Sequence, residues 1–563
     1  MTIQMIKKSN FASSNPLINK QFAMQKRCYA GIRFSGVFLL IFLFTSAIVL
    51  SQTQRQDPNE GIKKYNTLMQ IIKFAYVDTV NESKLVEKAI IETLKELDPH
   101  SVYIPKKEVQ RANEPLEGNF DGIGVQFEIL RDTITVVHPV PGGPSEKLGI
   151  MSGDKIIKID NEIVVNKKID NQFVLDHLRG KRGTKVMVSI YRKGKKDLID
   201  YTIVRDKIPI NSIDAAYMIT PETGYINLNK FSQSSIQEFD AALNKLKPQG
   251  MKNLILDLRN NAGGYMGTAI ELSDEFLLPG KLIVFTKGIR SPREDYFSTS
   301  KGQFETGKLV IMINENSASA SEIVSGAIQD WDRGIIVGRR SFGKGLVQRP
   351  FQLPDSSQIR LTTARYYNPS GKCIQKPYGD GVDKYYEDFS QRVRHGELIH
   401  ADSIKFPDSL KYYTSKKRVV YGGGGIMPDV FIPWDSTPIS DYYLDLRRKN
   451  VINSFVGDYT DRNRKTLQKE YPDFSAYNKN FQLDDIFMAG FFEYSEKQGV
   501  KKDDKGYAAA ENLIKSQIKG LIAQKLWDMN ELFTIINQYD DEVQRTLQIM
   551  QDDALFDKLK IDR

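Results

Sequence analysis

The sequence predicts a multidomain α/β protein, in which an α/β core with an inserted β-rich domain is flanked by helical regions. Between residues 207 and 435, apolar runs of strand length alternate with segments whose apolar residues recur at helical spacing. Residues 116–206 contain short β-like runs punctuated by glycine, and helical patterns dominate before and after these two regions. A chain of 563 residues is long enough for three or four domains.

The first 56 residues combine positive charge with an apolar run. Residues 34–51 carry no charge, and their length is at the lower edge of a membrane span. Because basic residues precede this run, we expect the N-terminus in the cytoplasm and everything from about Gln52 onward outside it. No small-x-small cleavage site follows, which favours an uncleaved signal anchor over a removed signal peptide. The expected location is the cell envelope, with the main part of the chain inner-membrane anchored or periplasmic.

The charge balance gives no support to a nucleic-acid partner. The formal net charge is +9, and seven basic residues precede the first acidic residue, Asp57. The remainder is close to neutral, so no basic nucleic-acid face is expected. Cys373 is the single cysteine of the exported part, which excludes an intrachain disulfide there. The five histidines form no His-Glu-x-x-His motif, so we expect no zinc site and no cofactor.

Residues 57–115 are expected to form a small helical region. Apolar residues recur there at helical spacing, and Asp98-Pro99 is the expected end of the helices. The simplest interpretation is an amphipathic packing or dimerisation unit. The residues that define the spacing are Leu68, Ile71, Ile72, Ala75, Leu85, Ala89, Ile90 and Leu94.

Residues 116–206 resemble a PDZ domain. The resemblance rests on the ordered set of β-like runs and on the segments 144–150 and 153–154 between them. It implies that the strand from Val125 to Ile129 pairs with a bound peptide, while the preceding loop binds the terminal carboxylate through backbone N–H groups. The loop residues are Gly122, Ile123, Gly124 and Val125.

In the core, residues 207–435, a buried strand at 309–313 is followed by a serine-rich turn and then by a helical pattern at about 321–329. Such a turn exposes a hydroxyl beside the N–H groups of a helix start, which can stabilise negative charge. Serine-rich helix starts are more often caps than nucleophiles, so this run alone does not identify a site. Further strands are predicted at 224–228, 254–258 and 335–337, and further helices at about 236–246 and 269–277.

Lys344 lies between two glycines in residues 338–348, with no acidic neighbour in the segment. In a poorly solvated turn, such a lysine is neutral near pH 7 and can take a proton from a serine. Two alternatives compete with this interpretation. Residues 338–344 fit Gly-x-x-x-x-Gly-Lys, but Gly345 occupies the place of the Mg²⁺-binding Ser or Thr of a phosphate loop. The other alternative is a solvated surface lysine.

Taken together, the segments 317–322 (Ser-Ala-Ser-Ala-Ser-Glu) and 342–345 (Phe-Gly-Lys-Gly), followed by Gln348, resemble the C-terminal processing (tail-specific) peptidases, serine proteases with a Ser/Lys dyad. The resemblance implies that Ser319 is the nucleophile, Lys344 its general base, and Gln348 the residue that orients the lysine. The resemblance extends to residues 254–264, 361–367 and 422–429. The implied fold is an α/β peptidase core with an inserted PDZ domain.

By the same resemblance, the oxyanion hole is assigned to the N–H groups of Gly264 and Ala320, with Gly263 as the alternative. Three positions depart from the family pattern: Ala262, Asn316 and Arg340. Arg340 is expected to lower the pKa of Lys344 by its positive charge. Asp330 is a further candidate for supporting the site, with a helix-surface carboxylate as the alternative.

Residues 436–563 are polar with helical patterns, and we expect a C-terminal helical domain of unknown role. The whole chain is therefore interpreted as a serine endopeptidase that recognises polypeptide C-termini through its PDZ domain and cleaves through an acyl-enzyme. Its expected partners are polypeptides with accessible C-termini and the membrane; a homo-oligomer and an adaptor protein are left open. The alternatives are a non-catalytic PDZ scaffold that retains the fold and a cytosolic nucleotide-binding protein.

Overall fold

The computed structural model describes residues 59–563. The basic segment and the signal anchor or signal peptide expected in residues 1–56 lie outside the described residues. Within the described part, no helix combines the length and the apolar character needed to cross a membrane.

The chain divides into a small unit that ends at Glu87 and a large unit from Lys88 onward. The apolar spacing in the small unit gives α2 (Glu60–Ala75), which buries none of its residues. The next helix, α3 (Glu82–Lys95), continues into the large unit and buries Leu94 there. Both helices were predicted from the spacing of apolar residues.

A six-stranded sheet with the order β10-β11-β12-β15-β16-β21 forms the centre of the large unit. All neighbouring pairs from β11 to β21 are parallel, and β10 pairs with β11 antiparallel. The four strands predicted from apolar runs are its four inner members, which confirms the α/β fold class. The bounds are β10 (Ile213–Met218), β11 (Thr223–Leu228), β12 (Asn253–Asp257), β15 (Leu309–Ile313), β16 (Ile335–Gly338) and β21 (Val430–Phe431).

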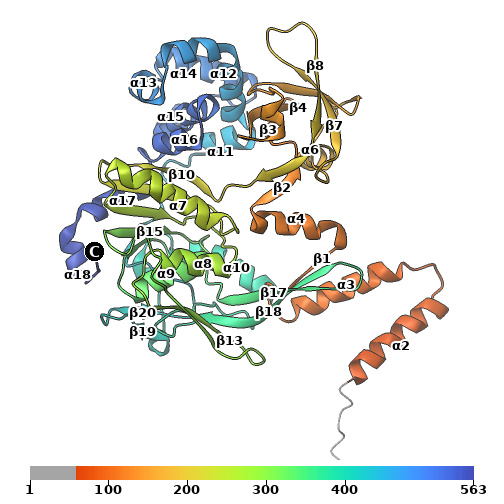
Figure 1. Ribbon diagram of the computed structural model, residues 1–563, viewed down its shortest axis with the longest axis vertical. Coiled ribbons are helices and arrows are strands. Elements are labelled where there is room, and N and C mark those ends of the chain that lie inside the picture. The colour runs from red at the N-terminus through yellow and green to blue at the C-terminus, as the bar shows by residue number, and fades with distance from the viewer. Residues whose placement is uncertain (1–58) are drawn as a thin grey trace, which may run out of the picture. The chain divides into compact units, whose positions relative to one another are not determined.

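Helices cover both faces of this sheet (Figure 1). Leu254 and Leu256 pack into one core cluster, whereas Ile255 between them packs into another. Side chains along a strand point alternately to the two faces, so neighbouring residues of β12 contact different helices. The first face is covered by α7 (Ser235–Leu246), α8 (Met266–Asp274) and α9 (Ala320–Asp330), and the second by α17 (Asp541–Gln551) and α18 (Asp553–Lys558).

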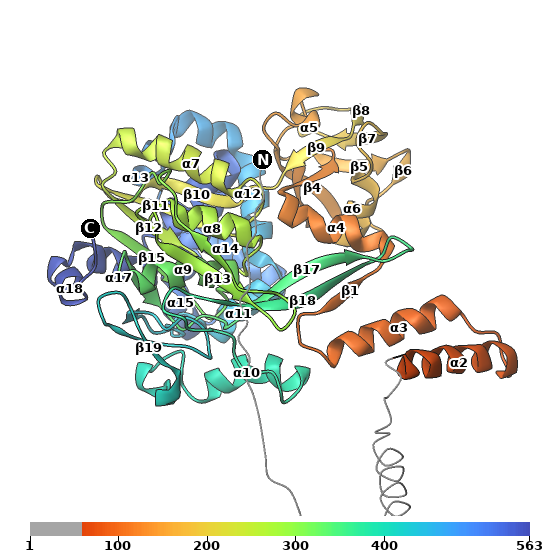
Figure 2. The same ribbon diagram turned by 60° about the horizontal axis from the view of Figure 1, so that its bottom comes forward.

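A second, antiparallel sheet has the order β1-β18-β13-β14, and β17 also pairs with β18 (Figure 2). Its first strand lies within residues 57–115, the expected helical region, and begins just after Asp98-Pro99, where the helices were expected to end. Pro99 ends the helical region, and the β-branched and aromatic residues after it form a short strand that pairs Val102 with Arg360. The bounds are β1 (Val102–Ile104), β13 (Leu282–Lys287), β14 (Glu294–Phe297), β17 (Leu346–Gln352) and β18 (Gln358–Tyr367).

The β domain forms a third sheet with the order β3-β4-β5-β7-β8, and β6 pairs with β5. It follows α4 (Lys106–Glu117) and is bracketed by β2 (Asn119–Gly122) and β9 (Asp206–Pro209), which pair with each other. The other bounds are β3 (Val125–Leu130), β4 (Thr133–Pro139), α5 (Pro144–Lys147), β5 (Lys155–Ile159), β6 (Glu162–Ile163), α6 (Asn171–Leu178), β7 (Lys185–Tyr191) and β8 (Ile199–Val204).

The expected helical domain of residues 436–563 divides in the structure. Helices α11 to α16 enclose a cluster of their own, whereas α17 and α18 belong to the layer that covers the central sheet. Helical periodicity is the same for both kinds of packing. The bounds are α11 (Asp441–Arg448), α12 (Val451–Glu470), α13 (Phe474–Asn480), α14 (Asp485–Lys497), α15 (Asp504–Leu526) and α16 (Met529–Ile536), and α10 (Val382–Arg394), β19 (Lys411–Tyr413) and β20 (Val419–Tyr421) precede them.

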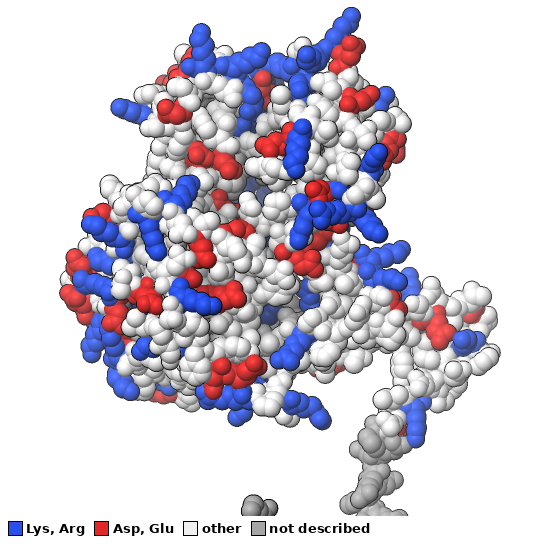
Figure 3. All heavy atoms as spheres, viewed as in Figure 1, with Lys and Arg blue, Asp and Glu red and all other residues white. Residues whose placement is uncertain are grey.

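Charged side chains of both signs are interspersed over the face of the molecule in Figure 3. This mixture agrees with the nearly neutral balance of the sequence after its N-terminal segment.

Candidate active site

Ser319 lies at the carboxyl edge of the central sheet, where β15 leads into α9. It is the N-cap residue of α9, with φ 55° and ψ −110°. A residue other than glycine in this conformation carries backbone strain, which is frequent at functional sites. The Ser317 hydroxyl holds the turn, because it donates to Leu258 O at 2.8 Å and accepts from Asn314 N–H at 2.9 Å. A half-buried serine is thus fixed in a tight turn at a helix N-terminus.

The buried carboxylate of Glu322 organises the two loops that carry the predicted dyad. One oxygen accepts from Ser319 N–H at 2.8 Å and Lys344 N–H at 2.9 Å. The other accepts from Gly343 N–H at 2.7 Å and from the Ser341 hydroxyl at 2.5 Å. Burial raises the pKa of Glu322 to about 7, and the four donors oppose this shift. A single side chain therefore fixes the backbone at the serine relative to the backbone at the lysine.

A buried tyrosine joins the same two loops from β18. The Tyr366 hydroxyl lies 3.1 Å from Ser319 O and 2.7 Å from Lys344 O, and both carbonyls are its acceptors. The structure therefore brings the backbones of Ser319 and Lys344 together through two independent side chains.

The Lys344 ammonium is half-buried and is held by Gln348. Its Nζ donates to Gln348 Oε1 at 3.0 Å, as the sequence analysis predicted for an orienting glutamine. Burial lowers the pKa of Lys344 below its usual value, against the carboxylates of Glu322 and Asp98, and the Arg360 charge lowers it further. The lysine is thus biased toward the neutral form that a general base requires.

The segment before β1 completes the surroundings of Gln348. Gln348 Nε2 donates to His100 O. The Asp98 carboxylate fixes this segment, because it accepts from His100 N–H at 2.8 Å and from the Ser101 hydroxyl at 2.6 Å. Burial lowers the pKa of His100 to about 4, and its Nε2 lies 2.8 Å from the Tyr385 hydroxyl. The amide of Gln348 is therefore fixed at both ends.

The predicted oxyanion donors lie beside the serine. Gly263 has φ 102°, and a Cβ there would lie 2.9 Å from Ser319 Cβ and 3.0 Å from Ala320 N, so the close approach requires glycine. Gly263 N–H already donates to Asn261 Oδ1 at 2.9 Å. The N–H groups of Gly264 and Ala320 make no hydrogen bond within residues 59–563. Of the two glycines, Gly264 therefore has the amide that is free to bind an oxyanion.

The predicted peptide-binding loop of the β domain lies beside a groove of about 200 Å³ between β3 and α6. Strand β3 is at the edge of its sheet, so its outer backbone groups are available to an added strand. The groove is lined by Phe120, Ile123, Gly124, Val125, Gln126, Phe127, Val174, Leu175, Leu178 and Arg179.

Asp330 does not reach the site. It lies at the other end of α9 from Ser319, is 2% exposed, and pairs with Lys372 Nζ at 2.5 Å. Both sequence interpretations of this residue, support for the site and a helix-surface carboxylate, are therefore wrong. Asp330 is a buried structural ion-pair partner.

Arg340 is likewise not the cation that affects the lysine. Its guanidinium binds Glu397 at 2.6 Å, and Arg360 supplies the positive charge near Lys344. The phosphate-loop alternative also lacks its structural context, because β17 follows Gly345 where a phosphate loop continues into a helix.

The sequence predicted no functional role for Glu322, Asp98 or His100. The spacing Ser319-x-x-Glu322 is a capping-box pattern, and this signal could have identified Glu322. Asp98 and His100 lie more than 200 positions before Lys344, and no local pattern predicts that β1 brings them to the site.

Comparisons with known proteins match four segments of the chain. Residues 222–387 match the peptidase family S41, and residues 122–203 match the PDZ domain. Residues 29–108 match the N-terminal domain of the activating protease CtpB, and residues 442–528 match a family of unknown function.

Proteins similar in sequence include two bacterial proteases. The carboxy-terminal-processing protease of Bartonella bacilliformis is 34% identical over 346 residues, which cover 61% of this chain and 79% of the relative. The carboxy-terminal processing protease CtpA of Bacillus subtilis is 32% identical over 339 residues, which cover 60% of this chain and 72% of the relative. Among solved structures, the photosystem II D1 C-terminal processing protease matches at 24% identity with a TM-score of 0.33, over 66% of this chain and 92% of that protein.

Proposed function

The chain belongs to the C-terminal processing peptidases of family S41 and is a protease with a PDZ domain, and from this premise we propose that it is a serine endopeptidase with a Ser/Lys dyad. Ser319 is the nucleophile, Lys344 the general base, and Gln348 the residue that orients the lysine. The N–H groups of Gly264 and Ala320 bind the oxyanion.

In the first half of the reaction, Ser319 Oγ attacks the scissile carbonyl carbon while neutral Lys344 accepts the hydroxyl proton. The carbonyl oxygen becomes an oxyanion that the two free N–H groups stabilise. The C–N bond then breaks, the lysine returns its proton to the leaving amine, and an acyl-enzyme remains. In the second half, water replaces the amine, and Lys344 again accepts and returns the proton.

The observation that carries this proposal is the Glu322 carboxylate, which accepts from the N–H groups of both Ser319 and Lys344. Four donors satisfy this buried carboxylate, so it can hold the backbones at the serine and the lysine in one arrangement. The lowered pKa of Lys344 and its contact with Gln348 support the same roles.

Recognition of the substrate is assigned to the groove between β3 and α6. An extended polypeptide adds to the edge strand β3, and its terminal carboxylate binds the backbone N–H groups of residues 122–125. The apolar lining, which includes Ile123, Phe127, Val174 and Leu178, favours an apolar C-terminal side chain. The substrates are therefore polypeptides with accessible, apolar C-termini.

The uncharged run at residues 34–51 and the basic residues before it support a place in the cell envelope. On this basis, the protease is anchored in the membrane by its N-terminal segment, and the part after about Gln52 acts outside the cytoplasm. This proposal concerns residues outside the described part of the chain.

The test is degradation of an unfolded protein with an apolar C-terminus by the purified full chain. We expect cleavage by the wild type and none by Ser319→Ala or Lys344→Ala. Both variants should unfold at the same denaturant concentration as the wild type, which shows that they are folded. The same substrate with an amidated C-terminus should be cleaved more slowly. Binding of the substrate without any cleavage by the wild type would instead support a non-catalytic scaffold.

A further inference from the structure

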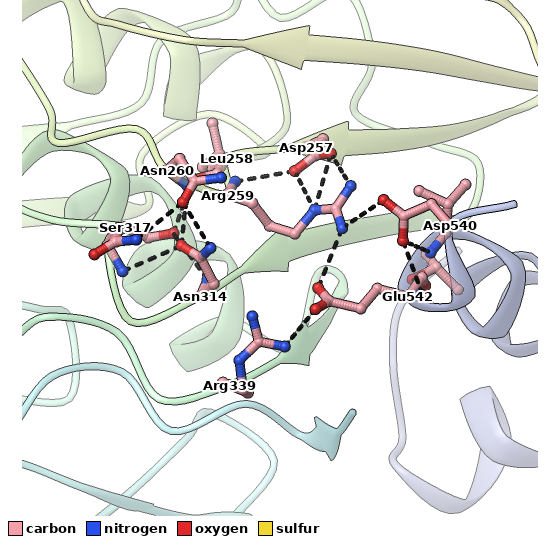
Figure 4. Close-up of polar contacts among 12 residues, drawn as sticks. Asp257, Leu258, Arg259, Asn260, Asn314, Ser317, Arg339, Asp540 and Glu542 are labelled. Carbon is pink, nitrogen blue, oxygen red and sulfur yellow. Dashed lines mark hydrogen bonds and ion pairs between the residues drawn. The ribbon is translucent and has the colours of Figure 1, made fainter. Parts of the chain in front are cut away.

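A network of buried ion pairs lies where the carboxyl ends of β12 and β16 meet the first turn of α17 (Figure 4). The Arg259 guanidinium binds Asp257 at 2.7 Å, Asp540 at 3.0 Å and Glu542 at 3.2 Å. These contacts connect the peptidase sheet with a helix that begins almost 200 positions after Lys344 in the sequence.

Arg339 forms the other half of this network. Its Nε donates to Glu315 at 2.8 Å, and its Nη1 donates to Glu542. Glu542 therefore uses one oxygen for Arg339 and the other for Arg259. It bridges two arginines that belong to different loops (Figure 4).

Each loop in this network carries a part of the proposed machinery. Arg259 lies five positions before Gly264, and Arg339 lies five positions before Lys344. Glu315, the second partner of Arg339, lies four positions before Ser319. We call residues 259–264 the oxyanion loop, 339–345 the lysine loop and 315–319 the nucleophile loop. The contacts of Arg259 with Glu542, of Glu542 with Arg339 and of Arg339 with Glu315 thus connect the three loops.

Other contacts also join these loops, and the most direct of them connect the loop of Arg259 with the loop of Ser319. Asn260 N–H donates to Asn314 Oδ1 at 2.9 Å, and Asn314 Nδ2 donates to Asn260 Oδ1 at 3.0 Å (Figure 4). Ala318 N–H donates to Asn261 O at 3.0 Å. The oxyanion loop and the nucleophile loop therefore form one framework. Glu322 and Glu315 connect the nucleophile loop with the loop of Lys344, and Glu542 adds a contact between the oxyanion loop and the loop of Lys344.

The ion pairs are shielded from water. The exposed fractions of the side chains are 14% for Arg259, 4% for Arg339 and 15% for Glu542. Charges in such surroundings are screened far less than surface pairs, and the planar guanidinium fixes the direction of each contact. The network can therefore hold the loops in a defined geometry.

We propose that Glu542 is a positioning residue of the active site, which fixes the lysine loop relative to the oxyanion loop by bridging Arg339 and Arg259. This inference rests on the proposed function. It gives the C-terminal segment a role in catalysis without contact with the substrate. Helix α17 presents Glu542 from its first turn, and its apolar residues Val543 and Met550 anchor the helix on the sheet.

The variant Glu542→Gln removes the bridge selectively. Arg259 keeps Asp257 and Asp540, and Arg339 keeps Glu315, so neither guanidinium is left buried without a carboxylate. We therefore expect the variant to fold. A matched control is Asp541→Asn, which removes the same charge from an exposed position in the first turn of α17. Asp541 forms no ion pair with either arginine in residues 59–563.

Peptide cleavage and hydrogen exchange are measured on the full chain. For Glu542→Gln we expect a fall of kcat on the order of tenfold with an unchanged KM, because the reacting groups are misplaced while the peptide groove is intact. Amide exchange should rise in residues 259–264 and 339–345. Glu542→Asp, which is shorter but charged, should recover part of the rate, and Asp541→Asn should match the wild type in both measurements.

The proposal is overturned if Glu542→Gln has the wild-type kcat, or if exchange in both segments is unchanged. If Glu542→Gln does not fold, Arg339→Lys serves instead, because it keeps the charge and loses the planar fork; a wild-type kcat in that variant overturns the proposal. Failure of the proposed function has a different result, namely that Ser319→Ala retains the activity of the wild type.

Discussion

Replacement of Glu322 with Gln removes an ionisable carboxylate and one acceptor atom from the centre of the site without a change in side-chain size. In the wild type, one oxygen accepts from Ser319 N–H and Lys344 N–H, and the other from Gly343 N–H and the Ser341 hydroxyl. A glutamine has one carbonyl oxygen and one NH₂ group. Its NH₂ group must therefore face two of these donors.

The size of the stability loss follows from the more favourable of the two orientations that the glutamine amide can take. The NH₂ group is best placed toward Ser341 and Gly343, because a hydroxyl can accept as well as donate. Gly343 N–H then has no acceptor, which costs about 1–3 kcal/mol for a buried donor. Above pH 7, where the carboxylate is mostly ionised, the bonds that remain also lose the strengthening that an ionised acceptor gives. We expect Glu322→Gln to lower the free energy of unfolding by roughly 2–4 kcal/mol.

Denaturant unfolding measures this loss as a lower midpoint with an unchanged slope. The same variant should lower kcat, because the backbones at Ser319 and Lys344 lose a shared anchor. Glu271→Gln is the matched control, since Glu271 is exposed on α8. A Glu322→Gln variant with the midpoint and kcat of this control would refute the role assigned to the buried carboxylate.

Three further predictions concern the base, the oxyanion loop and the topology. Activity should rise with pH as Lys344 loses its proton; Gln348→Glu should shift this rise to higher pH because a carboxylate favours the ammonium, and Gln348→Ala should lower the rate with little shift. An unchanged pH–rate profile in the Glu variant would show that the two side chains do not interact. Gly263→Ala should reduce cleavage at least about tenfold, because its Cβ would clash with the loop of Ser319. Gly267→Ala should not reduce it, because there is open space around the added Cβ. Equal cleavage rates in the two variants would contradict the packing argument. Protease added to the outer face of the membrane should digest the chain after Gln52, and protection of that part, with controls digested, would reverse the topology.

The inner strands of the central sheet could be predicted from sequence because each is a short apolar run buried on both faces. Helix α9 and the turn before it followed from the change of apolar spacing after Ile313. The contact of Lys344 with Gln348 was predicted from the family pattern. Local periodicity and a matching motif were sufficient in these cases.

Contacts between distant segments could not be predicted in this way. Asp98 and His100 reach the site because β1 joins the second sheet, and nothing in their own segment indicates that pairing. Glu542 lies in a helix whose pattern resembles that of its neighbours, although α17 packs on the sheet and α16 mainly on other helices. Arg340 was expected to act on the lysine. Its ion pair with Glu397 could not be predicted, because the two residues lie 57 positions apart in the sequence.

The most direct test of the account is the rate of peptide cleavage by Lys344→Arg across the pH range. The guanidinium keeps its proton across the working pH range, so it cannot serve as the base, although the arginine side chain is similar in length to lysine. The account predicts no measurable cleavage at any pH, in a variant whose unfolding midpoint is close to that of the wild type. Cleavage at a near-wild-type rate would contradict the assignment of Lys344 as the general base for Ser319.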